Sequence, residues 1–188
     1  DYWVERDYPV ELNIRGEVLD GTVHTGGITT PFNGDVVINI YSKTRVSTID
    51  NGNHNGNYDV NVKENVTILD AIFNGIRNLT LESGSQVYLK ESNDFTLDNL
   101  TVNKDALLDL TKVTGDIKVN GDFIGYDNTS QDPLEGGAIF LHDNQILDIS
   151  GDVKGNTRLN SYNSINKVDL KENHTYIKAK ENASGSFV

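Results

Sequence analysis

Three aspartates stand at equivalent places in the sequence and could act together. Asp109, Asp148 and Asp169 are each the middle residue of an apolar-Asp-apolar triplet. If these triplets are strands that stack, their outward residues form one column, which we expect to hold Thr67, Tyr88, Asp109, Asp148 and Asp169. Neighbouring strands lie about 4.8 Å apart, so the three carboxylates would repel one another.

Three explanations for such a row stay open. Solvent and nearby lysines can screen the charges without any ligand, and the lysines are Lys112, Lys167 and Lys171. A calcium ion can bridge the carboxylates, because Ca²⁺ prefers oxygen ligands. Two carboxyl groups about 5 Å apart can also act as the pair of a retaining glycosidase. An exposed strand face encloses a substrate poorly, which counts against catalysis.

A segment between two glycines is the second candidate site, and it interrupts the repeat described below. Gly125 to Gly137 contains an aromatic ring that can stack on a sugar and oxygen-bearing side chains that can bind hydroxyls or a cation. The residues expected to contact a ligand are Tyr126, Asp127, Asn128, Asp132 and Glu135. The alternative is an insertion that the fold tolerates and that binds nothing.

Other patterns typical of cofactor sites are weaker. The first part of a calcium loop is matched by Asn51, Asn53, Asn55, Gly56 and Asp59. Val62 stands where that loop needs its final glutamate, and a turn between two strands explains the same residues. The four histidines show no zinc-binding spacing, and the chain has no cysteine. We therefore expect no cofactor, with calcium left open.

The elements that would position these residues repeat along the chain. Asn78-Leu-Thr-Leu81 with Val87-Tyr-Leu89 recurs 21 residues later as Asn99-Leu-Thr-Val102 with Leu108-Asp-Leu110. The same interval relates these units to an earlier one, Asn57-Tyr-Asp-Val60 with Val66-Thr-Ile68, and relates Leu147-Asp-Ile149 to Val168-Asp-Leu170. The step from Leu108 to Leu147 is 39 residues, which marks an insertion.

Alternation of apolar and polar residues in each unit predicts short strands with one buried face. The residues expected to point inward are Leu79, Leu81, Val87, Leu89, Leu100, Val102, Leu108 and Leu110. Phe95–Leu97 and Ile117–Val119 indicate a third strand in each coil, and Asn57, Asn78 and Asn99 are expected to stack their amides. The chain is thus expected to be an all-β solenoid with about 21 residues per coil. Residues 1–34 are expected to cap it, and residues 35–188 to form the solenoid domain, as one structural unit.

Two stretches carry a resemblance to a known group of proteins. NLTLESGSQVYL (residues 78–89) and GGAIFLHDNQILDISGDVKGN (residues 136–156) resemble the repeats of right-handed parallel β-helices. Within that fold, they resemble the pectate-lyase-like adhesive domains of Gram-positive bacterial surface proteins, over about residues 35–170. The resemblance implies a right-handed coil and a non-catalytic cell-surface adhesin, or a domain of a secreted bacterial protein that binds carbohydrate or another host ligand.

Related β-helix proteins also include polysaccharide lyases and glycoside hydrolases, which remain the alternative. The sequence contains no Gly-His-Gly element and no adjacent Asp-Asp pair, and its five arginines are well separated. We therefore expect a binding protein and assign no catalytic residue.

The net charge of the chain restricts the classes of molecule that can be its partner. Sixteen Lys and Arg against 28 Asp and Glu give a net charge of −12, which repels nucleic acids and anionic lipid surfaces. The apolar runs are far shorter than the ~20 residues that cross a bilayer. We expect a host or bacterial glycan or a matrix protein as partner, no nucleic acid and no membrane insertion. The acidic, Asn-rich and cysteine-free composition is similar to that of Gram-positive wall proteins, which predicts an extracellular place at the bacterial cell surface or cell wall.

Overall fold

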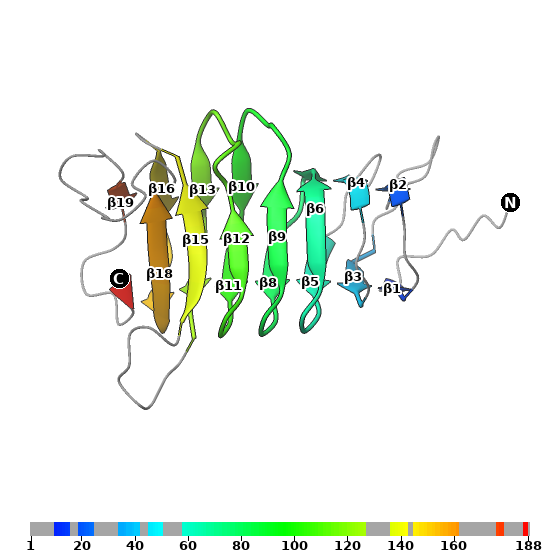
Figure 1. Ribbon diagram of the computed structural model, residues 1–188, viewed down its shortest axis with the longest axis horizontal. Coiled ribbons are helices and arrows are strands. Elements are labelled where there is room, and N and C mark those ends of the chain that lie inside the picture. The colour runs from blue at the N-terminus through cyan, green and yellow to red at the C-terminus, as the bar shows by residue number, and fades with distance from the viewer. Residues whose placement is uncertain are drawn as a thin grey trace, which may run out of the picture.

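The computed structural model describes residues 10–15, 19–24, 34–41, 45–50, 58–126, 136–142, 145–161, 176–178 and 186–187. Within these ranges every regular element is a β-strand, and no helix long and apolar enough to span a membrane occurs. The strands stack side by side along one axis as a parallel β-solenoid (Figure 1), which confirms the expected fold class.

Four parallel sheets run along the described part of the solenoid. The first sheet consists of β1 (Val10–Ile14), β3 (Val36–Ile40), β5 (Tyr58–Val62), β8 (Asn78–Leu81), β11 (Asn99–Val102), β14 (Phe123–Ile124) and β17 (Val153–Lys154). The second sheet consists of β6 (Thr67–Ala71), β9 (Gln86–Leu89), β12 (Leu107–Asp109), β15 (Gly137–Leu141), β18 (Asn156–Ser161) and β20 (Ser186–Phe187). The third sheet consists of β10 (Phe95–Leu97), β13 (Ile117–Val119), β16 (Ile146–Ile149) and β19 (Tyr176–Lys178). The fourth sheet consists of β2 (Leu19–His24), β4 (Arg45–Asp50) and β7 (Phe73–Asn74).

The core lies inside the coil, where the apolar residues of each alternating strand point. All eight residues expected to point inward are buried, with at most 3% of their surface exposed. They stack in columns through the parallel register, so that Leu79 pairs with Leu100 and Val87 with Leu108, each 21 residues apart. Burial of these columns removes apolar surface from water coil by coil and stabilises the stack.

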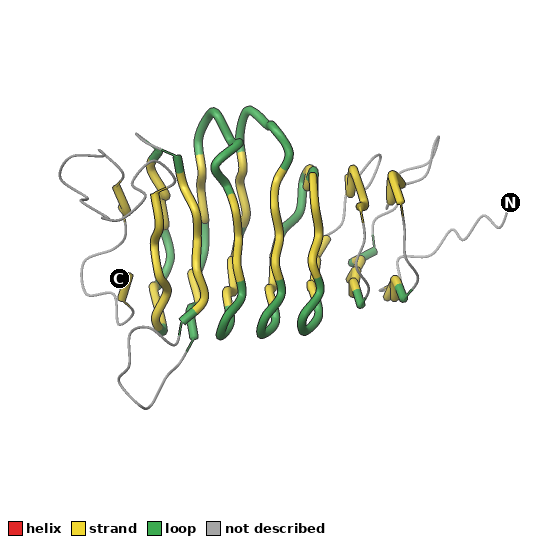
Figure 2. The backbone as a smooth tube through the Cα atoms, viewed as in Figure 1, coloured by secondary structure: helices red, strands yellow, loops and turns green. Residues whose placement is uncertain are grey.

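One recurring turn joins the first sheet to the second, and Figure 2 shows these turns as short loops along one edge of the solenoid. Each turn closes with a hydrogen bond from the fourth residue's N–H to the first residue's carbonyl, as from Ser85 to Glu82. Its third residue has a positive φ: 57° at Asn65, 71° at Gly84 and 56° at Asp105. Asn, Gly and Asp are the residue types that tolerate this left-handed conformation.

The register before residue 78 differs from the expected one by two residues. Asp59, not Asn57, stands opposite Asn78, and Ile68 stands opposite Val87. A bulge in β6 then places Ala71 opposite Leu89, because one extra residue is accommodated at Leu69–Asp70, where Asp70 has φ of 54°. Asn57 lies outside the described residues.

The strands after the insertion also differ from the expected assignment. β14 is the first-sheet strand of that coil, so the segment from Gly125 to Gly137 joins the first sheet to the second. β15 therefore belongs to the second sheet, and β16 to the third, where Leu147 pairs with Ile117. β14 is only two residues long and has one inward residue, Phe123, which is too little alternation for a sequence pattern to show.

Two strands fall within residues 1–34, the range expected to form a cap. β1 pairs in parallel with β3, and β2 pairs in parallel with β4. The described part of that range therefore contains coil strands of the solenoid itself.

Candidate functional site

The outward face of the second sheet gathers aromatic and apolar side chains around one carboxylate. The parallel register places Asp109 opposite Tyr88 on one side and Phe140 on the other. We call Tyr88, Asp109 and Phe140 the aromatic column. A second column on the same face contains Gln86, Leu107 and Ala138, of which Ala138 is buried.

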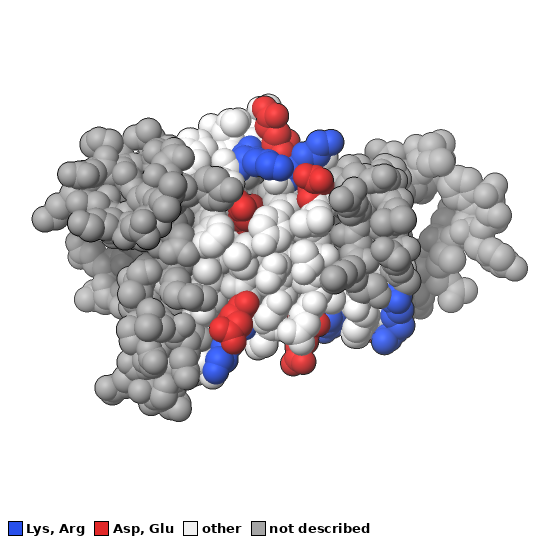
Figure 3. Space-filling model, viewed as in Figure 1, with Lys and Arg blue, Asp and Glu red and all other residues white. Residues whose placement is uncertain are grey.

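Few charges lie on this face, although the chain carries a net charge of −12. In Figure 3 the charged side chains gather mainly along the upper and lower margins of the described surface, with uncharged residues between them. Lys112 and Asp70 form an ion pair at 3.5 Å, with more than half of each side chain exposed. A largely uncharged face that contains aromatic rings is suited to an apolar or hydroxyl-rich ligand.

Tyr88 lies along the sheet surface and not straight out into solvent. Its hydroxyl is 3.1 Å from Oε1 of Gln86, two residues earlier on the same face of β9, and donates a hydrogen bond to it. Both side chains are partly exposed. The hydrogen bond holds the ring in place before any ligand arrives, which lowers the entropy cost of binding.

Asp109 is held by the turn that follows β12. Its Oδ1 accepts hydrogen bonds from the backbone N–H of Thr111 at 2.9 Å and from the Thr111 hydroxyl at 2.6 Å. Its Oδ2 has no hydrogen-bond partner among the residues that the structure describes. One oxygen therefore orients the carboxylate, while the other can accept a hydrogen bond from a ligand.

The rings on either side of Asp109 come from strands two steps apart in the sheet. Strand spacing places the backbones of Tyr88 and Phe140 about 10 Å apart, with Asp109 between them. Phe140 is partly exposed. A ligand that touches both rings must cross the strands and follow the solenoid axis.

The expected row of three aspartates is wrong in its geometry. Asp109 lies in the second sheet between two aromatic residues, whereas Asp148 lies in the third sheet opposite Lys118 and Lys178. Asp169 lies outside the described residues. The row fails because it assumed that β16 follows β12 in the same sheet.

The surroundings of Asp148 contain charges of both signs. Lys118 donates a hydrogen bond to Asp116 at 2.7 Å. The pKa of Lys118 is raised, mainly by this hydrogen bond and the Asp116 charge, with smaller effects of Asp94 and Asp148. No group of three or more His, Asp or Glu in the described residues could hold a metal ion.

Of the five insertion residues expected to bind a ligand, the structure describes Tyr126. Its ring lies 5.8 Å from Nζ of Lys104, which belongs to the turn before β12. Asp127, Asn128, Asp132 and Glu135 lie outside the described residues. A binding role for the insertion stays a prediction.

The first sheet carries polar ladders on its outward face. Nδ2 of Asn99 donates to Oδ1 of Asn78 at 2.7 Å, which confirms that these two amides stack. Asn78 in turn donates to Asp59, which also accepts two hydrogen bonds from Arg77, at 2.9 and 2.6 Å. The bond from Arg77 to Asp59 raises the pKa of Arg77, since Asp59 stabilises the charged guanidinium.

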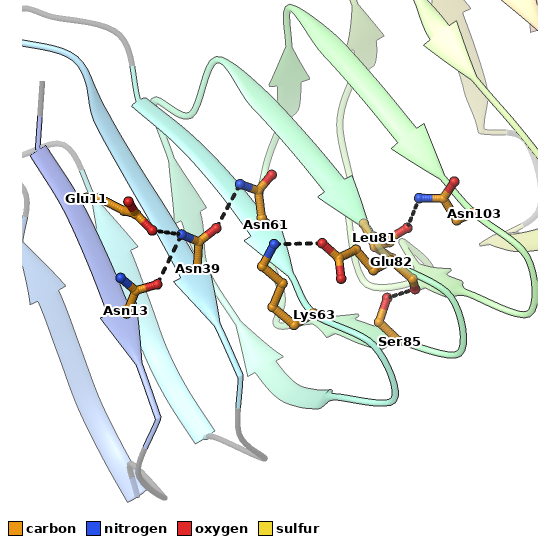
Figure 4. A network of polar contacts seen from close by, with 9 residues as sticks. All are labelled: Glu11, Asn13, Asn39, Asn61, Lys63, Leu81, Glu82, Ser85 and Asn103. Carbon is orange, nitrogen blue, oxygen red and sulfur yellow. Dashed lines mark hydrogen bonds and ion pairs between the residues drawn. The ribbon is translucent and has the colours of Figure 1, made fainter.

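A second asparagine ladder was missed from the sequence. Figure 4 shows Asn61 donating to Asn39, which donates to Asn13 and Glu11. The signal was an Asn at the fourth position of β1, β3 and β5, but the unequal steps between these strands hid it. Asp59 also belongs to the weak calcium-loop pattern noted in the sequence, and the other residues of that pattern, 51, 53, 55 and 56, lie outside the described ranges.

Comparison of the chain with protein-family models, curated proteins and solved structures gave no match. The resemblance found in the sequence is therefore supported only at the level of a parallel β-solenoid.

Proposed function

We propose that this protein is a non-catalytic carbohydrate-binding domain whose ligand lies on the aromatic column. The main observation in support is the strand register, which places Asp109 between Tyr88 and Phe140 on a largely uncharged face. Aromatic rings stack on the C–H face of sugars, and a carboxylate oxygen accepts hydrogen bonds from sugar hydroxyls.

Binding is preferred to cleavage because of what surrounds Asp109. Its neighbours on both adjacent strands are aromatic residues, so the column offers a single carboxylate where a glycosidase uses two. The acidic, Asn-rich and cysteine-free composition is similar to that of Gram-positive wall proteins, which supports an extracellular setting at the surface of a bacterium, with a host or bacterial glycan as partner.

The test is affinity electrophoresis through gels that contain a panel of plant, bacterial and host polysaccharides. At least one polysaccharide should retard the wild type, and Tyr88→Ala or Phe140→Ala should weaken that retardation about tenfold, because a ring contact contributes about 0.5–1.5 kcal/mol beyond its buried area. Tyr41→Ala is the matched control, since Tyr41 is 37% exposed and lies beside Arg15, away from the column.

Three results would contradict the proposal. Binding that survives both ring substitutions, in variants that melt like the wild type, would place the site elsewhere. Release of reducing sugar from the retained polysaccharide would show an enzyme, and no retardation by any polysaccharide would reject the function.

A further inference from the structure

The aromatic column contains one charged group, and its geometry bears on which glycans can bind. Asp109 is the middle residue, so a ligand that spans Tyr88 and Phe140 passes over its carboxylate. Oδ1 already accepts two hydrogen bonds from Thr111. The group presented to the ligand is therefore Oδ2, a pure acceptor with negative charge.

An acceptor with negative charge distinguishes between sugars. It binds the hydroxyl groups of a neutral sugar, whereas it repels the carboxylate of a uronic acid or a sulfate ester at the same place. None of the other residues in the two columns from β9 to β15 is charged; they are Gln86, Tyr88, Leu107, Ala138 and Phe140. Between β9 and β15 these columns therefore hold no cation that could offset the repulsion. The second column continues on β18 with Arg158, which stands opposite Ala138 and two strands away from β12.

We propose that Asp109 is a specificity-determining residue that selects uncharged glycans and rejects polyanionic ones, with Thr111 as the residue that positions it. This inference rests on the proposed function. The ligand is a neutral oligosaccharide long enough to reach both rings, and it runs across the strands.

Replacement of Asp109 by Asn gives a sharp test, because Thr111 dictates how the new amide must turn. Both Thr111 groups donate to Oδ1, so the amide oxygen of Asn must keep that place. Its NH₂ group then points where Oδ2 was. Asp109→Asn therefore replaces a negative acceptor by a neutral donor, which can bind a carboxylate.

The experiment is isothermal titration of the folded protein with two sets of length-matched oligosaccharides. One set holds neutral xylo- and cello-oligosaccharides and the other holds oligogalacturonates. The wild type should bind a neutral chain at least about tenfold more tightly than its anionic counterpart. Asp109→Asn should shift this ratio about tenfold or more toward the anionic chain, and Thr111→Val, which removes one of the two hydrogen bonds, should weaken neutral binding several-fold.

Asp105→Asn is the control for net charge. Asp105 is exposed on the turn before β12, and Asn tolerates its φ of 56°. It should leave the neutral-to-anionic ratio unchanged at both low and high salt.

The outcomes separate this inference from the proposed function. If the wild type binds both sets equally, or if Asp105→Asn shifts the ratio as much as Asp109→Asn does, the inference is wrong while glycan binding stands. If the wild type binds neither set, and no gel polysaccharide retards it, the proposed function fails and the inference fails with it.

Discussion

Asparagine side chains on the first sheet serve the fold through the hydrogen bonds they form along the axis. Asn99 donates to Asn78 in the preceding coil and accepts a hydrogen bond from the backbone N–H of Asp122 in the next, at 2.8 Å. One amide therefore links three coils. In the same way Oδ1 of Asp122 accepts from the backbone N–H of Asp152, which continues the ladder.

At the scale of this residue, Asn99→Ala should lower the free energy of unfolding by about 1–3 kcal/mol, because it leaves two partly buried groups without their partner. Urea unfolding followed by circular dichroism measures the change. Thr101→Ala, on the same strand and face, is the control and should cost clearly less. Equal losses for the two variants would show that the ladder contributes nothing specific.

At the scale of elements, the turn between the first and second sheets sets the corner of the coil. Asn65, Gly84 and Asp105 share its left-handed position, and adjacent turns are hydrogen-bonded to one another, as from Gly84 N–H to the Lys104 carbonyl. A Cβ at Gly84 would also lie 2.5 Å from Oδ1 of Asn65. Backbone strain and a side-chain contact therefore both favour glycine here.

Gly84→Ala should accordingly destabilise the protein by about 1–2 kcal/mol, the usual cost of a left-handed Ala. Adding Asn65→Gly removes the contact with Oδ1 but not the strain at residue 84, so the double variant should not regain wild-type stability. Ser83→Ala, in the same turn, should be nearly neutral. Thermal and urea unfolding check these changes, and full recovery in the double variant would show that the contact, not φ, is what matters.

The strands also show which features of the structure could be predicted from the sequence alone. Regular alternation in β8, β9, β11 and β12 made the fold class, the inward residues and the Asn78–Asn99 stack predictable. The pattern did not predict the register where a strand is very short or contains a bulge. These places are β14, which has one inward residue, and β6, where Asp70 lies in the bulge. The position of Tyr88 beside Asp109 was predicted from the repeat and is confirmed. The position of Phe140 on the other side was not, because it depends on placing β15 in the second sheet, which the pattern did not do.

At the scale of the whole molecule, the proposed site exists only because coils stack. Tyr88, Asp109 and Phe140 come from three successive strands of the second sheet, and the insertion before β15 leaves their register intact. The site is thus a rigid surface on regular strands, where a flexible chain of sugars can be recognised without rearrangement of the protein. Most charged side chains on this surface lie along its margins (Figure 3), and Asp109 is the charged residue of the aromatic column itself.

The most direct test of this account is an NMR titration of the isotope-labelled protein with the neutral oligosaccharide that binds it. We predict that the backbone amides that shift most belong to β9, β12 and β15, together with Thr111, whose N–H is bonded to Asp109. Shifts confined to the first sheet, or to the segment between Gly125 and Gly137, would contradict a binding site on the aromatic column.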